Sequence, residues 1–177
     1  MIGHNNGPTM EAGFAFRRHA WSKARKDLLP TLPIEILRRR VARAKTLGLP
    51  YKTYASVRAA SGHDVVAFLF SNNALHMLRR GDRPDAQRAA QLAKATPIAL
   101  AHPPFTGDDL PFEITAKAPG LTQSWAATRT ALRIPILSAN IPRNGVLVIA
   151  ETPLEAEWCA TARLAGTIPA KCLDLST

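Results

Sequence analysis

Polar residues that could carry chemistry follow three apolar runs of the chain. Ser71, Asn72 and Asn73 follow DVVAFLF, His102 follows TPIALA, and Glu151 follows GVLVIA. If these runs are parallel strands, their carboxyl ends meet at one edge of a sheet, which is where ligands gather in such folds. An imidazole with carboxylates at that edge could perform acid–base catalysis, bind a divalent metal, or hold a polar ligand without chemistry.

Each of these candidates also has a simpler structural interpretation. Asp108 and Asp109 lie beside a glycine, where aspartate commonly forms turns. Glu151 precedes the start of a predicted helix, where the helix dipole favours a carboxylate. His102 stands before two prolines and is most simply a loop residue. The weak catalytic candidates are therefore His102, Asp108 and Glu151.

The sequence contains no specific catalytic motif. GxGxxG, the P-loop, GxSxG and HExxH are all missing from the chain. The histidines at 4, 19, 63, 76 and 102 do not have metal-ligand spacing. Cys159 and Cys172 form neither a disulfide framework nor a zinc pair, which indicates a reducing compartment. We predict no cofactor and no metal ion, and we favour a protein that is not an enzyme.

The candidate residues come together only if the apolar runs form one sheet, and the sequence predicts such a sheet. Apolar or β-branched segments at 64–70, 96–101, 112–117, 134–139 (IPILSA), 145–151 and 170–175 (AKCLDL) are candidate strands; residues 84–95, 121–132 and 152–166 are expected helices. This alternation is typical of an α/β fold with a mostly parallel sheet and flanking helices. We expect this α/β domain to span 63–177.

A basic helical region is expected before that domain. Residues 1–13 are rich in glycine and asparagine and predict a flexible tail, and residues 14–29 predict an amphipathic helix. Residues 33–48 have apolar positions at helical spacing, with Gly48 as the stop. A further helix is expected from Pro50 to Gly62. Residues 14–62 thus form the predicted nucleic-acid-binding region.

The positive charge of the chain is concentrated in its first third. Residues 1–62 hold 12 Lys or Arg and 3 acidic residues, a net charge of +9, whereas residues 63–177 hold 11 and 10, a net charge of +1. Charge segregated in this way creates a directed field that attracts phosphate backbones or acidic surfaces.

The segment RAKTLGLPYKTYASVRAASG resembles the helix-turn-helix pattern. Ala44 lies four residues before Gly48, Leu49 follows the glycine, and Tyr54 and Val57 are spaced to seat a second helix. An ordinary helical hairpin with a solvated basic face has the same spacing. Tyr51 and Tyr54 could alternatively stack on unpaired bases, which would indicate RNA or single strands.

The leading functional prediction is a nucleic-acid-binding protein, with DNA favoured over RNA, that grips the phosphate backbone. The predicted contact residues are Arg38, Arg39, Arg40, Arg43, Lys45, Lys52, Thr53 and Arg58. Two alternatives remain open. One is a small enzyme that acts on nucleic acid or a nucleotide at the sheet edge, and the other is an inhibitor or adaptor that docks its basic face on an acidic protein.

The N-terminal sequence predicts a cytoplasmic location. MIGHNNGPTMEAG has no apolar core and is not typical of a secretory signal, and no apolar run reaches the length of about 20 residues that a membrane span needs. The opening MIGHN resembles the starts of prophage-borne bacterial proteins, which implies a phage or mobile-element origin.

Overall fold

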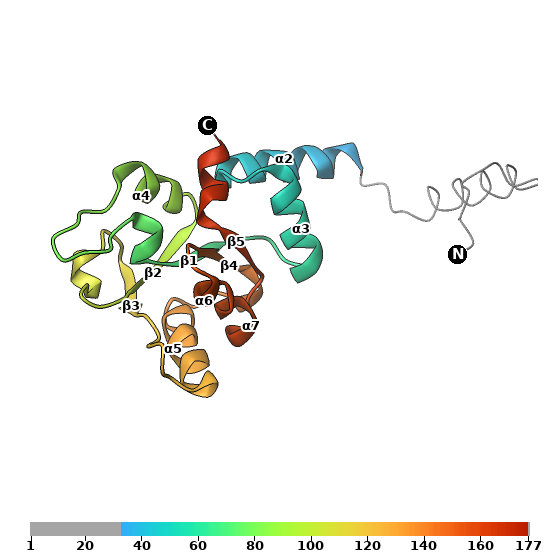
Figure 1. Ribbon diagram of the computed structural model, residues 1–177. Helices are drawn as coiled ribbons and strands as arrows, with labels where there is room; N and C mark the ends of the chain where they lie inside the picture. The colour runs from blue at the N-terminus through green and yellow to red at the C-terminus, as the bar shows by residue number, and fades with distance from the viewer. Residues whose placement is uncertain (1–32, 177) are drawn as a thin grey trace, which may run out of the picture. The chain divides into compact units, whose positions relative to one another are not determined.

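The computed structural model of the protein describes residues 33–176 (Figure 1). The predicted tail 1–13 and the predicted helix 14–29 lie outside the described residues. Residues Arg38–Thr177 cluster as one compact unit. No helix in the described part of the chain is long and apolar enough to cross a bilayer.

A five-stranded parallel sheet forms the centre of this unit. Its strands are β1 (Ala67–Ser71), β2 (Thr96–Ala101), β3 (Ile114–Lys117), β4 (Val146–Ala150) and β5 (Gly166–Pro169), in the spatial order β3-β2-β1-β4-β5. Every neighbouring pair is parallel. The predicted α/β class with a parallel sheet is therefore confirmed.

Helices flank both faces of the sheet (Figure 1). They are α2 (Ile34–Leu47), α3 (Tyr51–Ser61), α4 (Ala86–Leu92), α5 (Trp125–Ser138), α6 (Pro153–Ala156) and α7 (Trp158–Ala162), with 3-10 helices η1 (Asn72–Leu75), η2 (Gly107–Asp109), η3 (Arg143–Gly145) and η4 (Ala170–Ser176). Successive strand residues point to opposite faces, so the chain builds two cores. Phe68 and Phe70 pack with α2, α3 and α4, whereas Ala67 and Leu69 pack with α5 and α7.

The α2–α3 pair shares its core with the sheet. Leu47 of α2 and Tyr54 and Val57 of α3 are buried in the same cluster as Phe68. The predicted apolar stripe of α2 is only partly buried, because Ala44 is 1% exposed but Val41 is 45% exposed. Tyr54 and Val57 therefore anchor α3 to the sheet.

The predicted strand IPILSA is wrong, because residues 134–138 continue α5. The β-branched residues around Pro135 suggested a strand, and a proline inside a helix costs about 3 kcal/mol. The helix nevertheless continues because Leu132 and Ile136, four residues apart, are both fully buried against the sheet. Tertiary burial here overrides local preference.

The C-terminal elements also differ from the sequence prediction. The expected single helix 152–166 is two short helices, α6 and α7, and it ends at Arg163, which has a left-handed φ of 57°. Gly166 begins β5 instead of ending a helix. AKCLDL is the 3-10 helix η4 and not a strand, since β5 ends at Pro169, which has no amide hydrogen for a further ladder bond.

Gly48 turns the chain between α2 and α3 with a φ of +67°. The amide of Leu49 donates to the carbonyl of Ala44 at 2.9 Å across this turn. A Cβ at position 48 would meet Lys94 Nζ at 2.7 Å, but that atom is the end of a flexible side chain and can move away. Backbone strain is therefore the main obstacle to any other residue at position 48.

We expect Gly48→Val to lower the free energy of unfolding by about 1–3 kcal/mol, because a β-branched residue is strained in the left-handed region. Urea unfolding followed by circular dichroism measures this change. Gly120→Ala is the control, since a Cβ there makes only ordinary contacts, the nearest at 3.7 Å, and φ is not positive. Equal stability of the Gly48→Val variant and the wild-type protein would contradict the strain.

Candidate functional site

The strand order places the ends of β1 and β4 side by side at the middle of the sheet. The chain runs from β1 outward to β2 and β3, and then returns to place β4 on the other side of β1. Ligands bind at such reversal points, beyond the carboxyl ends of the strands. In this protein the two strands end at Ser71 and Ala150.

A buried carboxylate, Glu155, joins the residues that follow these strands. Its Oε2 accepts hydrogen bonds from the amides of Glu151 at 2.7 Å and Thr152 at 3.0 Å. Its Oε1 accepts from Asn73 Nδ2 at 2.9 Å and from the Ser71 hydroxyl. Glu155 is only 1% exposed, so its charge is stabilised by these donors rather than by water.

The local sequence explains the position of Glu155. The Thr152 hydroxyl caps α6 by accepting from the Glu155 amide at 3.3 Å. The Glu155 carboxylate in turn accepts from the Thr152 amide. This reciprocal pattern is a capping box, with proline at the first helical position. The sequence predicted a helix from residue 152, but it did not indicate that the Glu155 carboxylate would also contact Ser71 and Asn73.

His102 lies next to this carboxylate. Its backbone amide donates to Asn72 Oδ1 at 2.7 Å, and Asn72 Nδ2 donates to the Met77 carbonyl at 2.6 Å. The ring Nε2 is 3.9 Å from Glu155 Oε1, and the ring centroid is 6.0 Å from that of Trp158. Asn72 thus holds the loop after β2 so that the imidazole faces Glu155 and Trp158.

Burial lowers the pKa of His102 below its usual value of 6.5, and the nearby Glu155 charge only partly opposes this effect. The unfolded chain therefore binds a proton at a higher pH than the folded protein does. The resulting stability is fully present above about pH 6.5 and is lost as the pH falls through the lowered pKa.

We expect the free energy of unfolding to decrease as the pH is lowered from about 7 to about 5, and His102→Gln to remove part of that decrease. Urea unfolding at several pH values gives both curves. His63→Gln serves as the control because His63 is exposed. Identical pH curves for His102→Gln and the wild-type protein would show that the imidazole is not desolvated.

The carboxylate beside His102 is Glu155, which did not stand out in the sequence. Glu151 is exposed and contributes its backbone amide to Glu155. Asp109 accepts bonds from the Thr106 amide at 2.7 Å and hydroxyl at 2.9 Å, which lowers its pKa, so it caps a turn. Asp108 is exposed in the same turn. Within residues 33–176, no group of three or more His, Cys, Asp or Glu is arranged to hold a metal ion.

A pocket of about 440 Å³ opens beside this cluster. His102, Asn73 and Glu155 lie at its polar side, and Trp158 and Trp125 contribute aromatic surface. Its volume is within the range of roughly 300–1,000 Å³ that is common for small-molecule sites. The geometry therefore offers a concave site with a few convergent polar groups at the reversal point of the sheet.

The predicted nucleic-acid contacts lie on α2 and α3. Residues 38–62 contain seven Lys or Arg and no acidic residue. Among the predicted residues, Arg38, Arg39, Lys45 and Lys52 are exposed, and Arg40 is half-buried. Thr53 is half-buried on α3. The pair thus presents positive charge from two adjacent helices.

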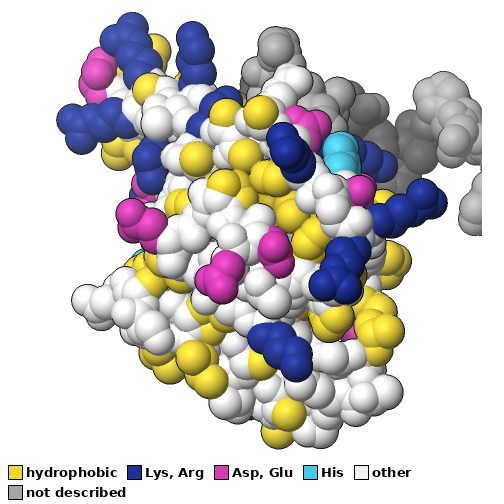
Figure 2. All heavy atoms as spheres, turned by 90° about the vertical axis from the view of Figure 1, so that its left-hand side faces the viewer, with side chains coloured by type: hydrophobic (Ala, Val, Ile, Leu, Met, Phe, Trp, Pro, Cys, Tyr) yellow, Lys and Arg dark blue, Asp and Glu magenta, His cyan; other side chains and the backbone are white. Residues whose placement is uncertain are grey.

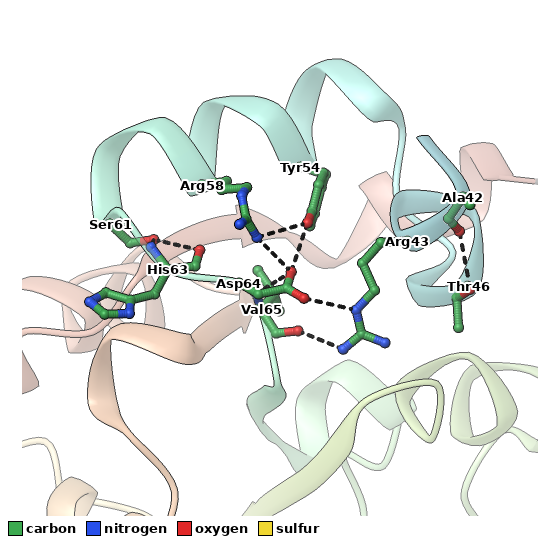
Figure 3. Close-up of polar contacts among 9 residues, drawn as sticks. All are labelled: Ala42, Arg43, Thr46, Tyr54, Arg58, Ser61, His63, Asp64 and Val65. Atoms are coloured by element: carbon green, nitrogen blue, oxygen red, sulfur yellow. Dashed lines mark hydrogen bonds and ion pairs between the residues drawn. The ribbon is translucent and has the colours of Figure 1, made fainter. Parts of the chain in front are cut away.

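Asp64 holds the remaining two arginines of the pair (Figure 3). Arg43 donates to Asp64 at 3.2 Å and to the Val65 carbonyl at 2.9 Å. Arg58 lies 3.5 Å from the same carboxylate, which also accepts from the Tyr54 hydroxyl at 2.7 Å. Burial and the bond to Asp64 raise the pKa of Tyr54. Arg43 and Arg58 therefore have a structural role that links α2 and α3 to the segment before β1.

Figure 2 shows several Lys and Arg side chains grouped at the upper left of this face, with others spread over its middle and lower part. Acidic side chains are more frequent in the middle of that face.

Comparison of the chain with protein-family models, with curated proteins and with solved structures found no match. The described part of the protein is a parallel α/β unit with a basic helix pair and a pocket at the carboxyl edge of its sheet.

Proposed function

We propose that the protein binds nucleic acid, with DNA favoured, through the α2–α3 pair. The observation that carries this proposal is the run of seven cations without an acidic residue over 38–62, on two helices that meet at the left-handed Gly48. Cationic side chains of this kind neutralise phosphates and release condensed counterions, which supplies most of non-specific nucleic-acid affinity.

The geometry divides the predicted contacts into two groups. Arg43 and Arg58 form ion pairs with Asp64 and mainly hold α2 and α3 against the segment before β1. Arg38, Arg39, Arg40, Lys45 and Lys52 are the proposed phosphate contacts, and Thr53 and Lys52 on α3 are the candidates for contact with base edges. In this proposal the protein works in the cytoplasm, and its origin in a phage or mobile element stays a prediction from its first five residues.

Three neutral substitutions test this proposal. We expect the combined variant Arg39→Gln, Lys45→Gln and Lys52→Gln to bind a labelled DNA duplex at least about tenfold more weakly, since three phosphate contacts are lost. Fluorescence anisotropy at fixed salt measures the affinity. The matched control replaces Arg79, Arg80 and Arg83 with glutamine, because these exposed residues give the same change in net charge outside the α2–α3 pair.

Equal weakening by both triple variants would mean that only net charge matters and would contradict a site on α2 and α3. Wild-type protein that binds neither DNA nor RNA at low salt would reject the proposal and favour an acidic protein as the partner of this surface.

A further inference from the structure

The pocket at the carboxyl edge of the sheet is lined by acidic and not by basic side chains. Glu155 and Glu157 are among its lining residues, whereas no Lys or Arg is among them in the part of the chain that the structure describes. The chain as a whole carries a net charge of +10, so this acidic lining does not follow from composition. The charge of the pocket therefore favours a cationic ligand over an anionic one.

The buried carboxylate of Glu155 is surrounded by neutral groups. Its hydrogen bonds come from two backbone amides, the Asn73 side-chain amide and the Ser71 hydroxyl. Within residues 33–176 its one ion-pair contact is with His102 at 3.9 Å, and burial lowers the pKa of that imidazole, which is therefore neutral at pH 7. A buried negative charge without a cationic partner attracts a positive group into the adjoining cavity.

Two other lining residues offer hydrogen-bond acceptors to a ligand. A neutral imidazole has one accepting nitrogen, and the His102 ring makes no hydrogen bond with the described residues. Asn73 donates its Nδ2 to Glu155, and its Oδ1 accepts no hydrogen bond within residues 33–176. Glu155 already accepts four bonds, so it contributes charge while His102 and Asn73 contribute acceptors. An ammonium group, which has three donors and no acceptor, is complementary to this set.

Aromatic and aliphatic side chains form the rest of the pocket. Trp158 is 5% exposed, and its ring centroid lies 6.0 Å from that of His102, so its indole is fixed beside the acceptors. Trp125, Leu121 and Leu154 also line the pocket, and all three are more than half exposed. An indole attracts a cation to its face, and apolar side chains cover the apolar part of a ligand. A volume of about 440 Å³ has room for a compact organic molecule.

Arg129 contacts the wall of the pocket without lining it. Its guanidinium carbon lies 3.5 Å from the centroid of the Trp125 ring, and its Nε donates to the Thr161 carbonyl at 3.0 Å. These contacts hold the Trp125 indole in place by covering one of its faces. One arginine beside two carboxylates leaves the pocket with an excess of negative charge.

We propose that the pocket binds a primary amine whose ammonium group is attached to a compact apolar body. The ammonium group donates to the His102 imidazole and to Asn73 Oδ1 near the two carboxylates, and the apolar body lies against Trp125 and Trp158. This inference goes beyond the proposed function, because no residue of α2 or α3 lines the pocket. The ammonium group belongs either to a free small molecule or to a lysine side chain of another protein.

Calorimetric titration of the full chain with 2-phenylethylamine and its neutral counterpart 2-phenylethanol tests the site. We expect the amine to bind at least about tenfold more tightly, because the two probes differ only in the group that meets the acceptors and carboxylates. Phenylacetate, which carries the opposite charge, should bind more weakly than the alcohol. Nα-acetyl-lysine amide distinguishes the two sources of the ammonium group: tighter binding than that of 2-phenylethylamine indicates a lysine side chain, and weaker binding indicates a free amine.

Substitutions separate the charge of the pocket from its apolar contacts. Glu157→Gln should weaken binding of the amine about two- to fivefold and leave binding of the alcohol unchanged, because Glu157 is exposed. Glu113→Gln is the matched control, since Glu113 is exposed, precedes β3 and does not line the pocket. Trp125→Ala should weaken the amine and the alcohol alike. Glu155→Gln should lower the ratio of the two affinities further than Glu157→Gln does, and this ratio is measured within one variant, so a loss of stability does not enter it.

Three results would overturn the proposal. Equal affinity of the wild-type protein for the amine and the alcohol, or no binding of either, would mean that the carboxylates do not select a cation. Tighter binding of phenylacetate than of the amine would assign the charge preference to Arg129. Equal weakening of amine binding by Glu157→Gln and Glu113→Gln would show that net charge, and not the pocket, attracts the amine.

Discussion

A fourfold increase in salt concentration is expected to weaken binding of a DNA duplex about 500-fold. Each neutralised phosphate contributes a slope of roughly −0.9 to the dependence of log affinity on log salt concentration. The α2–α3 pair offers about five cations for such contacts, since Asp64 engages Arg43 and Arg58. Five contacts give a slope of about −4.5, and a fourfold change in salt then corresponds to several hundredfold in affinity.

Anisotropy titrations at four or more salt concentrations give this slope. The triple glutamine variant of α2 and α3 should reduce it by about 2.7, because three contacts are removed. A steeper slope, near −6, would mean that the phosphate backbone also recruits Arg43 and Arg58 away from Asp64. A slope close to zero, with measurable affinity, would contradict phosphate contacts altogether.

Replacement of Glu155 by alanine is expected to lower the free energy of unfolding by about 3–5 kcal/mol. The carboxylate accepts from two side chains and two backbone amides, and it is only 1% exposed. Alanine would leave the Ser71 hydroxyl, the Asn73 amide and the α6 cap without their acceptor, and each buried unsatisfied group costs about 1–3 kcal/mol. Chemical unfolding measures the loss.

Two further variants identify the cause of that loss. Glu157→Ala removes an exposed carboxylate two residues away and should change stability by less than about 0.5 kcal/mol. Glu155→Gln keeps one acceptor oxygen and the shape of the side chain, so it should be intermediate. A Glu155→Ala variant as stable as Glu157→Ala would show that water replaces the carboxylate at little cost.

The sheet could be predicted from sequence because its strands carry a local signal. The segments that became β1, β2 and β4 are apolar runs buried on both faces, and such runs are typical of parallel strands. IPILSA carried a similar signal and is helical, because Leu132 and Ile136 are buried together only if the chain stays in a helix. That choice depends on packing against the sheet, which no local pattern contains.

The same distinction applies to the sites. The position of His102 followed from its place after a strand, and the left-handed turn at Gly48 followed from residue type. Glu155 was hidden because its spacing explains it fully as a helix cap, and only the meeting of β1 with β4 brings it to Ser71.

The shared core of α3 and the sheet has a consequence for the way in which a partner associates. Because Tyr54 and Val57 are buried with Phe68, the basic surface is assembled before any partner arrives. A segment that folds on binding loses roughly 1–2 kcal/mol of conformational freedom per ordered backbone residue, and that loss reduces its affinity. In the proposed function, α3 has no such loss because Tyr54 and Val57 already fix it to the sheet, so encounter would proceed directly to the bound state, at a rate set by diffusion and electrostatic attraction.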